Sequence, residues 1–254
     1  MHGGVVMPRE TSQNVVNALR LLECFAKEEE LGITELSEAI GVGKTATSRL
    51  VSSLEGFGYL RQNPATKKYR LGMKLVYLGS LVQDRQEMVR MVEPYLRLLG
   101  REFQISAHLA VQERGGALIL NKVSMGPMVY MDSRVGATLP LHASATGKCL
   151  LAFGGEKAFE AFIANGELSQ YTDFTITDPA RLMEEIRCVR ESGYAMDNEE
   201  SNIGLSCVGV PLLDARGCLV AALSLSGQTP FVLKKRENLL RRLKDVQEEL
   251  ARYL

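Results

Sequence analysis

The segment GVGKTATSRL, from Gly41 to Leu50, contains residue types that fit two different kinds of chemistry. GVGKT resembles the end of a phosphate-binding loop, in which glycine amides and a lysine hold the phosphates of a nucleotide. KTATSRL instead places hydroxyls and cations at helical spacing, as in a helix that contacts DNA. The two interpretations predict either a nucleotide-binding protein or a DNA-binding protein.

A phosphate-binding loop of the form GxxxxGK[ST] needs a glycine five residues before Gly43, and that position holds Glu38. The loop should also follow a buried strand, whereas TELSEAIG has the apolar spacing of a helix. A carboxylate near the phosphate site would repel a nucleotide. The sequence therefore favours DNA binding, and Gly43 is predicted to ease the start of a helix.

Apolar spacing predicts three short helices before residue 60, which would position this segment. Thr34 is predicted to cap the second helix and Gly41 to end it, so that the third follows after a tight turn. This order is typical of a helix-turn-helix motif. The predicted buried residues are Val15, Leu19, Leu22 and Phe25 in the first helix. In the third they are Leu50, Leu54 and Phe57, with Ala46 or Val51 as a further candidate.

A basic hairpin is predicted directly after the third helix. Tyr59-Leu60-Arg61 and the run Lys67–Leu71 flank the turn-prone Asn63-Pro64-Ala65-Thr66. A basic run alone often forms only a solvated face, but in this order the hairpin is typical of the wing of a winged helix-turn-helix. The residues predicted to contact DNA are Lys44, Thr45, Ser48, Arg49 and Ser52 in the helix, and Arg61, Lys67, Lys68 and Arg70 in the wing.

Composition limits the other possibilities. Thirty basic and thirty acidic residues cancel, so contact with a polyanion must be local, as in the stretch from Lys44 to Lys74 with seven basic residues and one acid. Five widely spaced cysteines without a CxxC pair indicate reduced thiols and neither a disulfide framework nor a zinc site. No apolar run reaches the ~20 residues of a membrane span. We expect a cytoplasmic protein without a metal or cofactor.

Two apolar stripes follow the wing. Leu75, Leu78 and Val82 form the first, and packing against a second copy or against the chain's own domains are equally compatible with it. Dimerisation is favoured because paired recognition helices meet half-sites about 34 Å apart. The second stripe is predicted to include Pro94 in its first turn. Its residues are Val89, Val92, Leu96, Leu99 and Phe103.

Strand patterns begin near Ile105. AHLAVQER and ALILNKVSM are predicted to form a hairpin, VYMDSRVG precedes a turn, and LSCVGVPLLD and CLVAALSLSG form a second hairpin. Helices are predicted in ATGKCLLAF, EKAFEAFIA, RLMEEIRCVRESG and the C-terminal run with Leu239, Leu243, Val246 and Leu250. Helices around a mainly antiparallel sheet define an α+β domain.

Taken together, these features resemble the IclR family of bacterial transcription regulators, from about Asn14 to Leu254. The segments that carry the resemblance are ITELSEAIGVGKTATSRLVSSLEGFGYL, YRLG, PLHASATGKCLLAF, SGYAMDNEESNIGLSCVGVPLLD and AALSLSG. The resemblance implies a winged helix-turn-helix DNA-binding domain at residues 12–72, a linker and dimerisation helix at 73–88, and a GAF-like ligand-binding domain at 89–254. It further implies a homodimer or tetramer that binds double-stranded operator DNA and controls a catabolic operon.

The family's ligands are usually small organic acids or aromatic metabolites, and the resemblance implies where this chain would hold one. The implied effector residues are Leu139, Ala145, Thr146, Gly147, Asp197, Cys207, Ser224 and Ser226. A helix beginning near Gly147 offers free amides and partial positive charge to a carboxylate. Asp197 then suits a ligand hydroxyl or an ordering role, because it would repel an acid. Each residue also has an ordinary structural interpretation, and His108 and His142 are predicted to be structural.

The chain departs from most relatives at Thr45-Ala46 and at Thr47, where an apolar residue is usual, so the operator sequence is not transferable. Gly209 lies near the implied pocket, where a larger residue would restrict ligand size, so the identity of the ligand is not transferable either. An enzyme using Cys207 as a nucleophile, or a sensor without DNA binding, is the alternative. No histidine is positioned by sequence to serve as its base, and the intact basic wing disfavours a sensor alone. Repression or activation depends on operator position.

Overall fold

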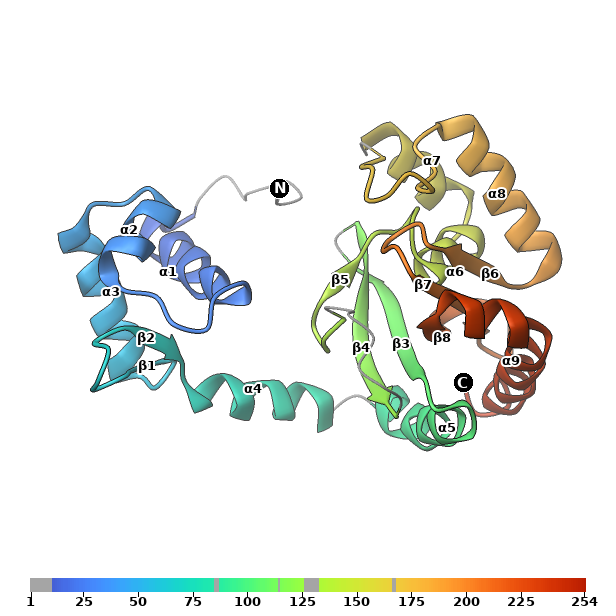
Figure 1. Ribbon diagram of the computed structural model, residues 1–254, viewed down its shortest axis with the longest axis horizontal. Coiled ribbons are helices and arrows are strands. Elements are labelled where there is room, and N and C mark those ends of the chain that lie inside the picture. Colours follow the sequence, from blue (N-terminus) through green and yellow to red (C-terminus); the bar gives the residue numbers. More distant parts are fainter. Residues whose placement is uncertain (1–10, 85–86, 114, 126–132, 166–167) are drawn as a thin grey trace. The chain divides into compact units, whose positions relative to one another are not determined.

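The computed structural model describes residues 11–84, 87–113, 115–125, 133–165 and 168–254 (Figure 1). The chain divides between Arg85 and Gln86 into two compact units, each with a hydrophobic core of its own. The boundary falls inside the predicted linker, residues 73–88. Half of the predicted segment VYMDSRVG, residues 129–132, lies outside the described residues, and residues 133–136 form no strand.

The N-terminal unit is a three-helix bundle followed by a hairpin and a further helix. Its elements are α1 (Gln13–Glu23), a 3₁₀ turn (Cys24–Ala26), α2 (Ile33–Ile40), α3 (Lys44–Gly56), β1 (Leu60–Gln62), β2 (Tyr69–Leu71) and α4 (Met73–Asp84). Leu21, Leu36, Ile40, Val51 and Leu60 form the centre of its core. The predicted order of helices and hairpin is confirmed.

The packing of α1 and α3 differs from the prediction. Val15 and Leu19 are each 57% exposed, and α1 buries Asn17 and Leu21 instead. Phe57 is 77% exposed because α3 ends before it. In short helices of a small bundle, neighbouring helices decide which side is covered, and apolar spacing alone does not resolve a rotation of the stripe.

The turn between α2 and α3 also differs in detail. Gly32, and not Thr34, precedes α2, and its amide donates to Glu35 Oε2 at 2.6 Å. Gly41 ends α2 with a left-handed φ of +70°, as predicted. Thr47 is fully buried, and its hydroxyl donates to the carbonyl of Val42 at 3.2 Å. Thr47 therefore belongs to the core and fixes the turn, so it is not part of the exposed face of α3.

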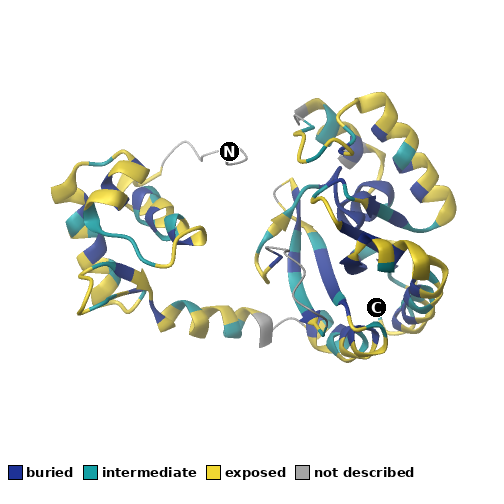
Figure 2. Cartoon of the chain, in the orientation of Figure 1, coloured by how far each residue is buried: buried dark blue, intermediate teal, exposed yellow. Residues whose placement is uncertain are grey.

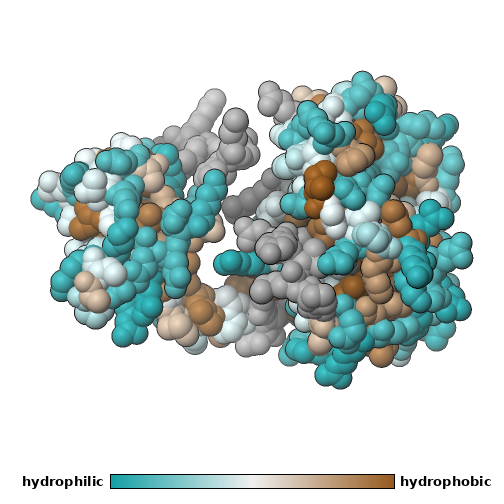
Figure 3. Space-filling model, in the orientation of Figure 1, coloured by the Kyte–Doolittle hydropathy of each residue, from teal (hydrophilic) through white to brown (hydrophobic). Residues whose placement is uncertain are grey.

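Helix α4 keeps an apolar surface that the described part of the N-terminal unit leaves uncovered. Met73, Val76, Tyr77 and Val82 are 54 to 74% exposed. The helix is largely yellow in Figure 2, and brown atoms mark its surface in Figure 3. Contiguous exposed apolar side chains are unusual on a monomer and indicate an interaction surface.

The C-terminal unit is built on a six-stranded antiparallel sheet in the order β5-β4-β3-β8-β7-β6. Its strands are β3 (Ser106–Glu113), β4 (Gly116–Ser124), β5 (Thr138–Leu139), β6 (Ala195–Asn198), β7 (Leu205–Leu213) and β8 (Leu219–Gln228). Both predicted hairpins are present. They meet through β3 and β8 at the middle of the sheet.

Helices cover both faces of this sheet (Figure 1). On one face lie α5 (Glu87–Phe103) and α9 (Thr229–Leu250), whose predicted stripes are buried apart from the partly exposed Phe103. On the other lie α6 (Ala145–Phe153), α7 (Glu156–Asn165) and α8 (Pro179–Ser192). Pro94 lies inside α5, which begins earlier than predicted. Across the described part of the chain, no helix has the length and apolar character to cross a membrane.

Candidate functional site

The open face of α3 carries most of the residues predicted to contact DNA. Thr45, Arg49 and Ser52 recur at three and four residue spacing and are exposed, whereas Thr47 and Val51 turn into the core. Lys44 is exposed at the first turn, and Ser48 is half-buried at the edge of this face. The structure thus gathers hydroxyls and cations on one side of a helix that can enter a major groove.

The wing forms as predicted, with Arg61 opposite Arg70 in the register of β1 and β2. Two hydrogen bonds fix its tip: the amide of Ala65 donates to Asn63 Oδ1 at 3.0 Å, and Asn63 donates to Glu30, which precedes α2, at 2.7 Å. Arg61, Lys67 and Arg70 are exposed. Lys68 differs, because its ammonium lies 2.8 Å from Glu35 Oε1. Three of the four wing cations are therefore exposed, and the fourth is paired within the unit.

In the C-terminal unit, a small cavity of about 10 Å³ lies between the start of α6 and the sheet. Seven of the eight predicted effector residues line it, all except Gly147. The lining residues are His108, Leu139, Ser144, Ala145, Thr146, Asp197, Ser201, Cys207, Ser224 and Ser226. Since a water molecule needs a cavity of at least about 10 Å³, this cavity has room for little more than one water.

Strand register brings the polar residues of the sheet together. Asp197 on β6, Cys207 on β7 and Ser226 on β8 lie opposite one another in successive strands. Two residues before Ser226 on β8, Ser224 lies opposite His108 on β3. Side chains two residues apart on a strand share a face, so both rows meet the cavity.

The start of α6 supplies donors to this cavity. Ala145 and Thr146 line it, and their amides belong to the first turn of a helix, which has no intrahelical partners. The Thr146 hydroxyl is buried and has no hydrogen-bond partner among the described residues. Ser144 caps the helix by accepting from the amide of Gly147 at 3.1 Å. Donors and helix dipole together favour an anionic group here.

Two glycines let α6 approach the sheet so closely. A Cβ on Gly147 would lie 2.5 Å from the Cα of Leu141, so this residue serves backbone packing behind the cavity. A Cβ on Gly209 would lie 3.1 Å from the backbone of Ala145. Gly209 therefore admits the helix start to the sheet, and a larger residue would displace a cavity wall.

Asp197 is buried and already holds several donors. Its Oδ1 accepts from the amide of Glu200 at 2.8 Å, and its Oδ2 accepts from the Ser201 hydroxyl at 2.6 Å. Burial raises the pKa of the Asp197 carboxyl, although these hydrogen bonds and the charge of Lys148 oppose the rise. Of the two roles predicted for Asp197, ordering the pocket is the one these contacts support.

His108 and Cys207 are both fully enclosed. Burial, with a smaller effect of Lys122, lowers the pKa of His108 to about 3, so its imidazole is neutral at pH 7. Its Nε2 lies 3.1 Å from Ser133 Oγ. Burial raises the pKa of the Cys207 thiol well above its ordinary value, and Ser226 donates to its sulfur at 3.0 Å. His142 lies elsewhere, against the carbonyl of Ser169 at 3.0 Å.

The sequence prediction missed three lining residues, His108, Ser144 and Ser201. His108 was predicted to be structural, and only its register opposite Ser224 identifies it as part of the wall. Ser144 precedes a predicted helix and was recognisable as a cap, but not as a wall residue. Within the described ranges, no group of three or more His, Cys, Asp or Glu residues is arranged to hold a metal ion.

A winged helix-turn-helix unit joined to a unit with an enclosed polar cavity defines the class of ligand-responsive DNA-binding regulators. Family models agree: the model for the bacterial transcriptional regulator IclR C-terminal domain matches residues 80–252, and the model for the IclR helix-turn-helix domain matches residues 14–64. The chain belongs to the IclR family of transcriptional regulators.

Individual relatives support this assignment. The HTH-type transcriptional regulator XynR of Escherichia coli is 35% identical over 221 residues, covering 87% of this chain and 88% of XynR. The crystal structure of the Thermotoga maritima IclR matches with a TM-score of 0.74 at 28% identity, covering 93% of this chain and 98% of that one. An IclR homologue from Microbacterium hydrocarbonoxydans, crystallised with 4-hydroxybenzoate, shares the fold, with a TM-score of 0.77, 23% identity, and 95% and 100% coverage.

Proposed function

We propose that this protein regulates transcription by binding operator DNA through α3 and the wing, and that a small organic acid controls this binding. The observation that carries the proposal is the cavity at the start of α6, where the buried Thr146 hydroxyl lacks a partner among the described residues. A buried donor left unsatisfied costs free energy that an acceptor-rich ligand recovers.

The chemistry of the cavity favours a carboxylate with a second polar group. The first amides of α6 and the Thr146 hydroxyl are donors suited to a carboxylate. Ser224 and His108 lie in register on the sheet and can meet a hydroxyl group. The M. hydrocarbonoxydans homologue was crystallised with 4-hydroxybenzoate, which has both groups. An acid with a hydroxyl group is therefore the effector class we propose.

The closed cavity supports a conformational response. About 10 Å³ cannot hold an organic acid, so binding must separate the start of α6 from the strands. A ligand that binds only the widened form shifts the equilibrium toward it. We propose that this shift reaches the DNA-binding units through the linker helix or through the balance between dimer and tetramer, as a coupling free energy between two sites.

Catalysis by the same pocket is disfavoured. A cysteine nucleophile reacts as the thiolate, and the pKa of Cys207 is raised by burial and by nearby Asp197. His108 remains neutral at pH 7 with a pKa of about 3, too low for an efficient general base near neutrality. We therefore propose a cytosolic regulator of a catabolic operon, acting as a homodimer or tetramer, and not an enzyme.

An electrophoretic mobility shift with the DNA upstream of the gene tests this proposal. We expect a retarded complex at low salt, whose midpoint shifts when 4-hydroxybenzoate or another hydroxy acid is added. The matching compounds without the carboxylate serve as controls and should have no effect. Absence of a complex at low salt would reject DNA regulation, and a complex insensitive to every acid would reject the effector class. Consumption of an acid by the purified protein would favour an enzyme.

A further inference from the structure

Lys148, on the first turns of α6, is a fully buried lysine. Its side chain is 1% exposed, and it is the largest side chain in the described structure that is buried so completely. A buried ammonium is costly unless several acceptors surround it. Here the ammonium donates to Glu200 Oε1 at 2.6 Å, to the carbonyl of Met196 at 2.9 Å and to Glu185 Oε1 at 3.0 Å. Its three hydrogens are thus fully used.

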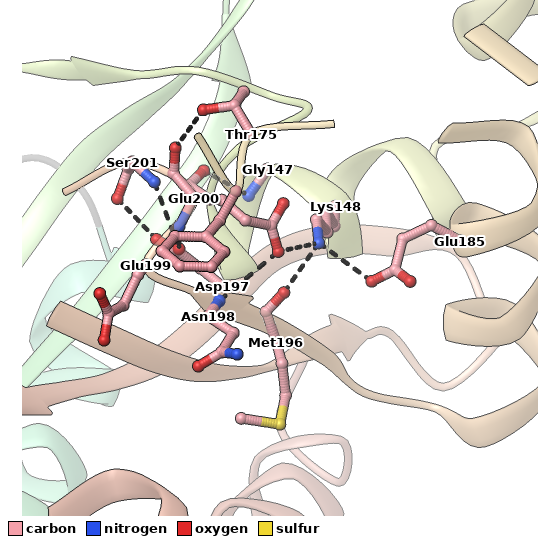
Figure 4. Close-up of polar contacts among 12 residues, drawn as sticks. Gly147, Lys148, Thr175, Glu185, Met196, Asp197, Asn198, Glu199, Glu200 and Ser201 are labelled. Atoms are coloured by element: carbon pink, nitrogen blue, oxygen red, sulfur yellow. Dashed lines mark hydrogen bonds and ion pairs between the residues drawn. The ribbon is translucent and has the colours of Figure 1, made fainter. Parts of the chain in front are cut away.

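These three acceptors come from different elements, as Figure 4 shows. Glu185 lies on α8, Met196 on β6, and Glu200 on the loop that follows β6. Lys148 itself follows directly after Ala145–Gly147, the start of α6. One ammonium therefore joins the two walls of the cavity, although Lys148 is not among its lining residues.

Contacts continue from Glu200 to the lining residues. The Glu200 amide donates to Asp197 Oδ1 at 2.8 Å, and Ser201 donates to Asp197 Oδ2 at 2.6 Å. On the outside, Thr175 donates to the carbonyl of Glu200 at 2.6 Å. The Thr172 hydroxyl donates to the carbonyl of Glu199 at 2.7 Å. The loop is thus held by its own Asp197, by these two threonines and by Lys148, and of these only Lys148 supplies a positive charge.

The network is not arranged for stability alone. Glu200 Oε2 is buried and has no partner among the described residues. Incompletely satisfied buried polar networks reduce stability, and an apolar core would serve stability better. Natural proteins retain such arrangements mainly where a function requires them. The place of this network, directly behind the cavity, suggests which function that is.

We propose that Lys148 is a positioning residue for the effector pocket: by neutralising Glu200 it fixes the 197–201 loop, and with it Asp197 and Ser201, against the start of α6. This inference rests on the proposed function only for the identity of the ligand. Without the ammonium, the Asp197 and Glu200 carboxylates would be buried close together with no cation between them. The loop would then open to hydrate them.

Hydrogen exchange of the full-length protein, followed by mass spectrometry, tests the proposal without a ligand. In Lys148→Met, which keeps most of the side chain's volume but removes its charge, we expect amides 197–204 to exchange roughly tenfold faster or more, since one partner of a buried ion pair is lost. Amides 106–113 of β3 should be unchanged. Glu185→Gln is the matched control, because Glu185 is partly exposed and keeps an acceptor; it should resemble the wild type.

A second variant separates charge from packing. In Lys148→Met/Glu200→Gln the unpaired carboxylate is gone, so protection of the loop should return toward that of the wild type. Unchanged loop exchange in Lys148→Met overturns the proposal. Faster exchange throughout residues 86–254 in both variants also overturns it, because Lys148 would then be an ordinary core residue.

Isothermal titration calorimetry with 4-hydroxybenzoate adds a measurement of affinity. We expect the Kd of Lys148→Met to rise about tenfold or more and that of the double variant to recover, because binding then includes the ordering of the loop. If 4-hydroxybenzoate does not bind the wild type while the exchange results hold, the proposed effector is wrong and the role of Lys148 stands. Wild-type affinity in Lys148→Met would overturn that role.

Discussion

Lys67 and Lys68 adjoin in the wing but differ in their surroundings. Lys67 is exposed at the tip with a φ of +59°, whereas Lys68 is paired with Glu35 at 2.8 Å. A lysine that contacts phosphate releases counterions, and a lysine that already has a carboxylate partner must first give it up. Neighbouring cations of the same type are therefore expected to contribute unequally to DNA binding.

We predict that Lys67→Asn lowers the slope of log affinity against log salt by about one, and that Lys68→Gln lowers it by less. Asparagine is chosen because it tolerates the left-handed backbone of residue 67. The measurement is a mobility shift with operator DNA at several salt concentrations. Equal slopes for the two variants would show that the Lys68–Glu35 ion pair does not reduce the contribution of Lys68 to DNA binding.

Arg49 lies on the exposed face of α3 with Thr45 and Ser52. If it contacts phosphate, Arg49→Ala weakens binding to every operator variant; if it reads a base, the variant loses about 1–3 kcal/mol and discrimination at one position. Binding to a set of single-base operator variants distinguishes the two. Arg101→Ala, an exposed arginine of α5, is the control. Wild-type affinity of Arg49→Ala at all salt concentrations would exclude a DNA contact.

His108 makes stability depend on pH. Its pKa is about 3 in the folded protein and 6.5 when unperturbed, so the unfolded chain binds the additional proton and stability is lost as pH falls below about 6.5. We predict that His108 alone lowers the free energy of unfolding by about 2 kcal/mol between pH 7 and pH 5. Urea unfolding at both pH values checks this, with His108→Gln as the comparison. An equal pH effect in wild type and variant would contradict it.

Among the elements, α6 depends on glycines for its close approach to neighbouring backbone. Since a Cβ on Gly147 would lie 2.5 Å from Leu141 Cα and 2.6 Å from its carbonyl oxygen, backbone would have to move. We predict that Gly147→Ala destabilises the C-terminal unit by about 1–3 kcal/mol, as overpacking does, and abolishes acid binding. Thermal melts and calorimetry measure these effects.

Gly43→Ala is the matched control for this prediction, since nothing lies within 4 Å of its added Cβ and its φ is −58°. It should fold like the wild type. A Gly147→Ala variant with unaltered stability and acid binding would mean that the start of α6 adjusts freely.

The elements also show what sequence reasoning can predict. Long patterns were reliable: Leu239, Leu243 and Val246 are buried in α9 as predicted. Short helices were not, and Val15 and Leu19 of α1 are exposed because packing against α2 and α3 sets its rotation. Local patterns record the period of an element, whereas its orientation depends on non-local partners.

The candidate site was predicted through family resemblance and not from patterns. Asp197, Cys207 and Ser226 meet only because β6, β7 and β8 pair in one register. His108 joins them through the pairing of β3 with β8, which no local sequence pattern predicts. The residues predicted to contact DNA, in contrast, lie within one short stretch, so charge and helical spacing were enough to propose them.

At the scale of the whole molecule, the exposed side chains of α4 favour the proposed homodimer. We predict that Val76→Asp, at a position 60% exposed, shifts the protein toward monomers and weakens operator binding, because two recognition helices must meet half-sites about 34 Å apart. Sedimentation velocity and mobility shifts measure both effects. Leu233→Asp, at a residue 47% exposed on α9, is the control. An unchanged monomer–dimer equilibrium in Val76→Asp would exclude α4 as the dimer contact.

The pairing of β3 with β8 at the centre of the sheet has a consequence for biosynthesis. Residues 114–218 separate the two strands, and the helix that covers them, α9, comes later still. The ribosome therefore delivers all of the N-terminal unit early, while the sheet closes only when the chain is nearly complete. On the function proposed above, a nascent or prematurely terminated chain would contain a folded DNA-binding unit before its effector pocket exists.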